Sequence, residues 1–120
     1  MRASDSPVDV VEAYYRYVDA EDYDALVALF ADDIVYHRPG HDPLEGIADF
    51  ERFYHEVRDL TEGTHELHDV IADGSRVAVR GSFTGLQGET PISLSFADFF
   101  GFGDDGRIRT RYTFTDQGQV

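Results

Sequence analysis

Residues 92–102 alternate between large apolar side chains and small ones, which is the pattern of a β-strand with one buried face. Asp98 falls in the apolar row, whose other members are Ile92, Leu94, Phe96, Phe100 and Phe102. An ionised carboxylate buried there without a partner costs roughly several kcal/mol, because it leaves water for an apolar environment. The segment therefore predicts a sheet-based fold in which Asp98 is ion-paired, protonated or facing a cavity.

The charge balance narrows the range of partners. The chain carries a net charge of −14, with 24 acidic residues against 10 basic ones, and every basic residue is an arginine. A lysine-free acidic surface repels polyanions, so we exclude nucleic acid and anionic membranes as partners. High salt screens the self-repulsion of such a surface, which predicts a halophilic protein. An ordinary acidic protein from a GC-rich genome is the alternative.

The chain length and the lack of cysteine limit the number of domains and the kinds of site that the protein can contain. A chain of 120 residues is long enough for one core, so we expect a single domain over residues 1–120. Without cysteine, the chain forms no disulfide, thiolate zinc site or cysteine nucleophile. No segment has the apolar run of a signal peptide or a membrane span, which predicts a soluble cytoplasmic protein.

Apolar spacing and turn residues predict helices followed by long strands. Ser6 and Pro7 mark a helix start, as N-cap and first helical residue. The predicted helices cover residues 8–20, 22–31 and 47–60. The predicted strands cover residues 34–38, 65–72, 76–86, 91–103 and 107–115, with a loop over residues 41–46. This order predicts an α+β domain whose helices cover one face of a curved, mostly antiparallel sheet, with Gly81 and Gly85 leaving room inside it.

The layout resembles the cone-shaped nuclear transport factor 2-like fold of SnoaL-like polyketide cyclases, limonene epoxide hydrolases and Δ5-3-ketosteroid isomerases. Ketosteroid isomerase is closest in register, since residues 22–24 and 27–33 are similar to its first-helix junction and second helix, and residues 52–54 to its third helix. The resemblance covers nearly the whole chain. It implies a conical pocket for a small apolar molecule, no cofactor, and a homodimer formed through the outer face of the sheet.

The same resemblance fills two of the isomerase's three catalytic positions. Tyr14 matches the tyrosine of the oxyanion hole and Asp98 matches its protonated aspartic acid, while Tyr54 matches a tyrosine that supports such networks. Arg38 stands before Pro39, where the isomerases carry the aspartate that shuttles the proton. A guanidinium does not act as a base near neutral pH, so the base of the isomerase mechanism is missing.

Two interpretations of Asp98 stay open. In the first, protonated Asp98 and Tyr14 donate hydrogen bonds to an enolate or phenolate oxygen, each worth roughly 2.7–4 kcal/mol. In the second, Arg38 pairs with Asp98 and closes the pocket, which leaves a domain without chemistry. Arg38 also has the planar fork that binds a carboxylate or phosphate, or polarises a carbonyl.

A substitute base is sought in the loop after the first strand. Strand alternation sends His37 to the face opposite Arg38, so His37 does not share the cavity with it. His41 and Asp42, in the loop at the mouth of the cone, are the candidates because both side chains can take a proton.

Aromatic side chains are predicted to line an apolar pocket or to fill the core; they are Tyr54, Phe83, Phe96 and Phe100. His65 and His68 are three residues apart in a predicted strand and point to opposite faces, so we predict no metal site. The expected function is a cofactor-free isomerase, cyclase or lyase that stabilises the enolate of an apolar ketone. A non-catalytic ligand-binding or accessory domain of the same fold is the alternative.

Overall fold

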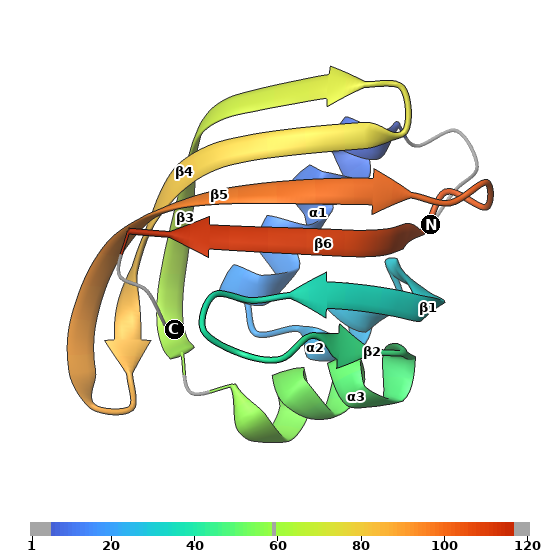
Figure 1. Ribbon diagram of the computed structural model, residues 1–120. Coiled ribbons are helices and arrows are strands. Elements are labelled where there is room, and N and C mark those ends of the chain that lie inside the picture. The colour runs from blue at the N-terminus through green and yellow to red at the C-terminus, as the bar shows by residue number, and fades with distance from the viewer. Residues whose placement is uncertain (1–5, 59, 117–120) are drawn as a thin grey trace.

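The computed structural model describes residues 6–58 and 60–116. Its strands are β1 (Phe30–His37), β2 (Leu44–Glu45), β3 (Leu60–Asp73), β4 (Arg76–Gln87), β5 (Thr90–Phe102) and β6 (Ile108–Thr115). They form one sheet in the order β2-β1-β6-β5-β4-β3, in which β1 runs parallel to β6 and the other neighbours are antiparallel. The sheet curves around helix α1 (Pro7–Asp19), as Figure 1 shows. The predicted α+β class is confirmed.

Helix α1 is fixed at both ends by its own sequence. Ser6 and Asp9 form a capping box, in which each side chain accepts a hydrogen bond from the other residue's backbone N–H. At the other end, the N–H groups of Glu21 and Asp22 donate to carbonyls of the last turn, and Glu21 takes a positive φ of 56°. The chain therefore turns sharply after α1 and leaves Asp19 as its last helical residue.

The second helix is shorter than predicted. It is α2 (Tyr23–Val27), capped by Asp22, and β1 begins already at Phe30. Phe30 is buried and pairs with buried Ile108 of β6. Pairing across the sheet thus overrides the helical spacing of residues 22–31, as tertiary contacts commonly do.

The third helix also differs from the prediction. Helix α3 (Ile47–Arg52) passes into a π-helical turn, η1 (Phe53–Val57), where a regular helix to residue 60 was expected. The turn ends where the N–H of extended Arg58 donates to the carbonyl of Phe53 at 2.7 Å. Such turns are frequent at functional sites, and this one places buried Tyr54 in the interior.

A β-bulge in β6 decides which of its side chains face the concave side of the sheet. The pairing with β5 shifts by one residue at Arg109, which lies between two paired residues. The alternation changes phase there, so Arg111 is buried and Thr113 is half-buried. Tyr112 and Phe114 are exposed on the outer face instead.

The buried row predicted for residues 92–102 is confirmed, because its members are buried or half-buried while Ser93, Ser95 and Phe99 are exposed. The predicted room at Gly81 and Gly85 is filled by aromatic rings. A Cβ atom on Gly81 would lie 2.9 Å from the ring of Phe96, and one on Gly85 would lie 2.8 Å from that of Phe83.

None of the helices among the described residues combines the length and the hydropathy needed to span a membrane.

Candidate active site

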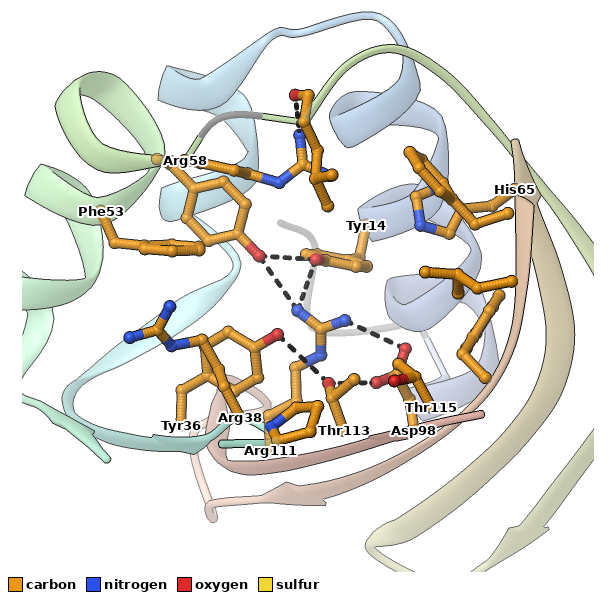
Figure 2. Close-up of a pocket in the computed structure, with 16 residues that line it drawn as sticks. Tyr14, Tyr36, Arg38, Phe53, Arg58, His65, Asp98, Arg111, Thr113 and Thr115 are labelled. Carbon is orange, nitrogen blue, oxygen red and sulfur yellow. Dashed lines mark hydrogen bonds and ion pairs between the residues drawn. The ribbon is translucent and has the colours of Figure 1, made fainter. Parts of the chain in front are cut away.

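A pocket lies between η1, the start of β3 and the concave face of the sheet (Figure 2). It is lined by Tyr14, Tyr36, Arg38, Pro39, Phe53, Tyr54, Arg58, Leu60, His65, Phe83, Leu94, Phe96, Asp98, Arg111, Thr113 and Thr115. Its cavity volume is about 60 Å³, whereas pockets for drug-sized ligands measure roughly 300–1,000 Å³. The pocket in this form accepts a small molecule or one end of a larger one.

Asp98 forms a buried ion pair with Arg111 at the floor of the pocket. The two residues are 1% and 4% exposed. Nη2 of Arg111 donates to one carboxylate oxygen at 3.0 Å and the Tyr15 hydroxyl donates to the same oxygen at 2.5 Å, while the Thr113 hydroxyl donates to the other oxygen. The second interpretation, in which Asp98 pairs with Arg38, is therefore wrong, because the cation that neutralises this carboxylate is Arg111.

Arg111 also joins two tyrosine hydroxyls from different helices. The hydroxyl oxygens of Tyr14 and Tyr54 lie 2.6 Å apart, and Nη1 of Arg111 donates to both, at 3.0 Å to Tyr54. The two hydroxyls carry two hydrogens, and their mutual hydrogen bond uses one. Among the described residues no acceptor is recorded for the second hydrogen, so it is available to a ligand.

Burial keeps the hydroxyl groups of Tyr14, Tyr15 and Tyr36 protonated. It raises the pKa of Tyr14 and of Tyr15 well above the usual range, although Arg111 opposes the shift at both. Burial likewise raises the pKa of Tyr36 to about 12. Burial works against the charge of Arg111, but Asp98 and the neighbouring tyrosines outweigh it and raise the pKa of Arg111. At neutral pH the pocket thus contains a fixed cation and neutral hydroxyl donors.

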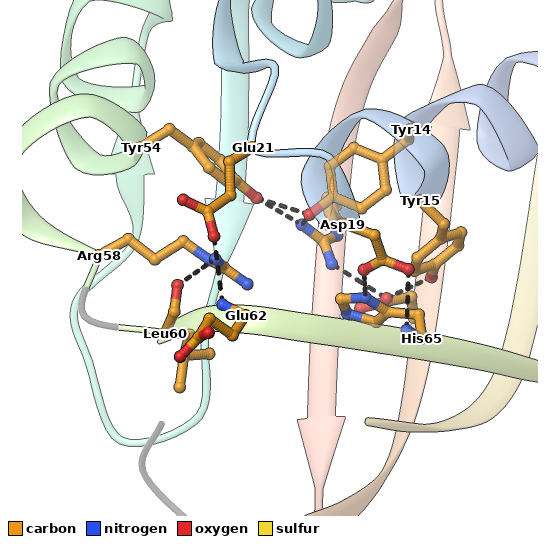
Figure 3. A network of polar contacts seen from close by, with 11 residues as sticks. Tyr14, Tyr15, Asp19, Glu21, Tyr54, Arg58, Leu60, Glu62 and His65 are labelled. Carbon is orange, nitrogen blue, oxygen red and sulfur yellow. Dashed lines mark hydrogen bonds and ion pairs between the residues drawn. The ribbon is translucent and has the colours of Figure 1, made fainter. Parts of the chain in front are cut away.

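His65 enters the same pocket from β3 and is held by Asp19 at the end of α1 (Figure 3). Nδ1 of His65 lies 2.5 Å from one carboxylate oxygen of Asp19, and the backbone N–H of His65 donates to the other at 2.9 Å. The two side chains are only 10% and 27% exposed. With the Nδ1 hydrogen directed at the carboxylate, Nε2 is left as the basic nitrogen of the ring.

Six of the residues predicted for the site meet in this pocket; they are Tyr14, Arg38, Tyr54, Phe83, Phe96 and Asp98. Phe100 is buried behind it, with its ring centroid 5.9 Å from that of Tyr14. His41 and Asp42 are exposed on the loop after β1 and do not line the pocket. His37 stacks on Tyr112 with ring centroids 4.2 Å apart, on the face opposite Arg38 as predicted.

Arg111 and the pairing of His65 with Asp19 were not predicted from the sequence. A buried aspartate in a strand row is a signal for a cation on a neighbouring strand, and Arg107, Arg109 and Arg111 all lie within or beside the next one. Asp19 and His65 are 46 residues apart, and they meet because the end of α1 lies against the start of β3. In residues 6–58 and 60–116 no group of three His, Asp or Glu side chains is arranged as a metal site.

The chain belongs to the SnoaL-like domain family, whose model matches residues 11–111. This family lies within the nuclear transport factor 2-like superfamily, so the predicted family resemblance and fold are confirmed. A search of curated protein sequences found no match.

Solved structures show the same fold. An epoxide hydrolase/cyclase-like enzyme, SalBIII, described in pyran ring formation in the polyether salinomycin, is 25% identical, with all of both chains covered and a TM-score of 0.81. An LEH-like epoxide hydrolase from M. tuberculosis is 22% identical over 92% of this chain and 83% of that one, with a TM-score of 0.81. A protein from Jannaschia sp. CCS1 that is described as a SnoaL-like polyketide cyclase is 18% identical over 92% of this chain and 85% of that one, with a TM-score of 0.77. The closer resemblance to ketosteroid isomerase stays a prediction.

Proposed function

We propose that this protein is a cofactor-free enzyme of the isomerase, cyclase or lyase type that stabilises an enolate. The observation that carries the proposal is the unused hydroxyl hydrogen at the Tyr14–Tyr54 pair, which Arg111 backs with a positive charge. His65, oriented by Asp19, lines the same pocket. Enolate formation requires a donor for the developing oxyanion and a base for the α-carbon, and we assign these roles to the tyrosine pair and to His65.

The proposed reaction begins with a ketone whose carbonyl oxygen accepts the hydrogen bond from the tyrosine pair. Nε2 of His65 takes the α-proton, the C–H electron pair forms the enolate double bond, and the negative charge develops on the oxygen. The imidazolium faces Asp19 and the C-terminal end of α1, which both stabilise a positive charge. In a β,γ-unsaturated ketone, return of the proton from His65 to the γ-carbon completes an isomerisation. In a cyclisation, the enolate carbon attacks a second carbonyl, and the alkoxide that forms takes the proton from His65.

Asp98 has a positioning role in this proposal. It accepts hydrogen bonds from Arg111, Tyr15 and Thr113, so it holds the guanidinium beneath the tyrosine pair. Asp98 thus acts as the counter-ion of Arg111 in this proposal, and not as the protonated hydrogen-bond donor that the family resemblance implied. His65 replaces His41 and Asp42 as the proposed base, because those two side chains lie outside the pocket.

Epoxide opening is a second candidate, favoured by the full-length match to the SalBIII structure. The same groups suit it, since a tyrosine hydroxyl donates to the epoxide oxygen while His65 deprotonates the attacking hydroxyl or water. The two chemistries differ in where the base acts, on a C–H bond or on an O–H bond.

Proton exchange at the α-carbon of cyclopentanone in D₂O, followed by NMR, tests the enolate proposal. The native protein should accelerate exchange over buffer, by about 10²–10⁴-fold where the base is well placed. His65→Gln should abolish the acceleration and Asp19→Asn should reduce it, while His68→Gln, on the exposed face of the same strand, should retain it. Exchange at the buffer rate together with turnover of cyclohexene oxide would favour epoxide opening instead.

We also propose a homodimer through the outer face of the sheet. Ile71, Phe99, Tyr112 and Phe114 are 65%, 48%, 41% and 55% exposed there, and the Phe99 and Phe114 rings are in edge-on contact at 5.9 Å. Exposed aromatics on one face are typical of an interaction surface. Sedimentation should show a dimer that dissociates in Phe114→Asp, and a monomeric native protein would refute this.

The proposed setting is the cytoplasm of a salt-accumulating cell. It is supported by the net charge of −14 and by the use of arginine as the sole basic residue besides histidine. Salt at molar concentration screens the repulsion that such a charge creates.

A further inference from the structure

The pocket has a charge opposite to that of the molecule around it. Its described lining contains three arginines, Arg38, Arg58 and Arg111, and one carboxylate, Asp98. Arg111 and Asp98 neutralise each other as an ion pair, so two positive charges remain in the lining of a chain whose net charge is −14. A positive pocket in a negative protein attracts an anion to that pocket specifically.

Arg38 is held in the lining without a recorded carboxylate partner among the described residues. Its guanidinium carbon lies 4.4 Å from the centre of the Phe53 ring. Its Nε is shielded from solvent and, within the described part of the chain, lacks a hydrogen-bond acceptor. A buried donor without an acceptor costs about 1–3 kcal/mol or more when charged, so a ligand that supplies the acceptor gains affinity.

A second arginine, Arg58, follows directly after η1, the turn that carries Phe53 and Tyr54. The guanidinium carbon of Arg58 lies 5.8 Å from the ring centre of Tyr54, and its Nη1 donates to the carbonyl of Leu60 at 2.7 Å. Figure 2 shows Arg38 and Phe53 on one side of the pocket and His65 on the other, with Arg111 and Tyr14 between them and Arg58 extending toward the middle above Tyr14. An anion beside Arg38 therefore leaves the tyrosine pair and His65 open to the rest of the molecule.

We propose that the substrate carries a carboxylate, which Arg38 binds through Nε and its terminal nitrogens, with Arg58 as a second positive charge. This inference rests on the proposed function, because it assigns the substrate class of the same pocket. The planar guanidinium fork matches a carboxylate in two parallel hydrogen bonds, and stacking on Phe53 fixes its plane. The substrate is then a keto acid, anchored by its carboxylate and activated at its ketone.

Binding of benzoate and of benzamide at fixed ionic strength, measured by calorimetry, tests the assignment. The two probes share shape and differ in charge. Benzoate should bind at least about tenfold more tightly, as expected for a charge-assisted hydrogen bond. Its binding should also shift the Arg38 Nε–H resonance in ¹⁵N NMR. Arg38→Gln should remove the preference, whereas Arg109→Gln should keep it, because exposed Arg109 pairs with Asp33 away from the pocket.

Equal affinity of the two probes, or a preference that survives Arg38→Gln, would overturn the carboxylate assignment. Binding of phenol to the same samples separates this failure from that of the proposed function. Phenol reports the tyrosine pair and carries no carboxylate. If phenol still binds and benzoate is not preferred over benzamide, the carboxylate subsite alone is refuted. If phenol does not bind either, the proposed function is refuted as well.

Discussion

At the scale of single residues, the charge of Asp98 is balanced by Arg111 on the neighbouring strand. The pair is almost fully buried, and each partner makes further hydrogen bonds to hydroxyl groups. Buried pairs of this kind add little net stability compared with apolar residues of the same size, but either partner alone is costly. The pair is therefore best explained as a device that positions the guanidinium beneath the pocket.

Breaking the pair from one side should destabilise the fold strongly. We expect Asp98→Leu to lower the free energy of unfolding by about 3–5 kcal/mol, because Arg111 keeps a buried charge without a counter-ion. The double variant Asp98→Leu/Arg111→Met should recover much of that loss. Urea titrations measure both. Asp33→Asn, at the exposed ion pair with Arg109, is the matched control and should change little. A double variant as unstable as the single one would contradict this explanation.

Part of the site could be predicted from local pattern and family resemblance. Asp98 was found because it interrupts an apolar strand row, and Tyr14 was found because its position matches the tyrosine of ketosteroid isomerase. Arg111 was not, since simple alternation from buried Ile108 directs it outward. The bulge at Arg109 reverses that direction, and a bulge is set by strand pairing, which spacing within one strand does not show.

At the scale of elements, the long antiparallel strands and the first helix followed from alternation, turn residues and the Ser6 cap. The ends of the second and third helices did not follow. Pairing of Phe30 with β6 shortens α2, and a π-helical turn replaces the last part of the third helix. Both outcomes depend on contacts with distant segments, which local helical spacing does not encode.

Close packing at Gly81 should make β4 intolerant of a larger residue. A Cβ atom there would lie 2.3 Å from the Glu66 carbonyl oxygen and 2.9 Å from the Phe96 ring, so backbone and ring must both move. We expect Gly81→Ala to cost about 1–3 kcal/mol in thermal or urea unfolding, the usual range for overpacking. Ser82→Ala, next along the same strand, is the control. An unchanged stability for Gly81→Ala would show that the strands separate without cost.

At the scale of the whole molecule, buried tyrosines limit stability in alkali. The pKa of Tyr36 rises from 10.0 to about 12 on folding, and those of Tyr14 and Tyr15 rise as well. The unfolded chain ionises first, so stability is complete below about pH 10 and falls as the pH rises through about 12. Tyr36 alone accounts for roughly 3 kcal/mol. Tyrosinate absorbance and circular dichroism should change together, and ionisation of these residues before unfolding would contradict the prediction.

The net charge predicts a stability that depends on salt. Raising KCl from 0.1 M to 2 M shortens the Debye length from about 10 Å to about 2 Å, which screens repulsion among the acidic side chains. We expect the melting temperature to rise by several degrees over this range, measured by circular dichroism. Sodium chloride should act similarly, since the effect is one of screening. A melting temperature independent of salt would refute the halophilic interpretation.

Binding of an oxyanion by the tyrosine pair and Arg111 can be tested through the affinity of a series of substituted phenols of increasing acidity. A bound phenol places its oxygen where the enolate oxygen would lie. We predict that affinity rises with phenol acidity in the native protein and falls at least about tenfold in Tyr14→Phe and Tyr54→Phe. The control Tyr112→Phe, on the outer face, should bind as the native protein does. Affinity that is independent of phenol acidity and unchanged in both pocket variants would show that the tyrosine pair and Arg111 do not bind an oxyanion.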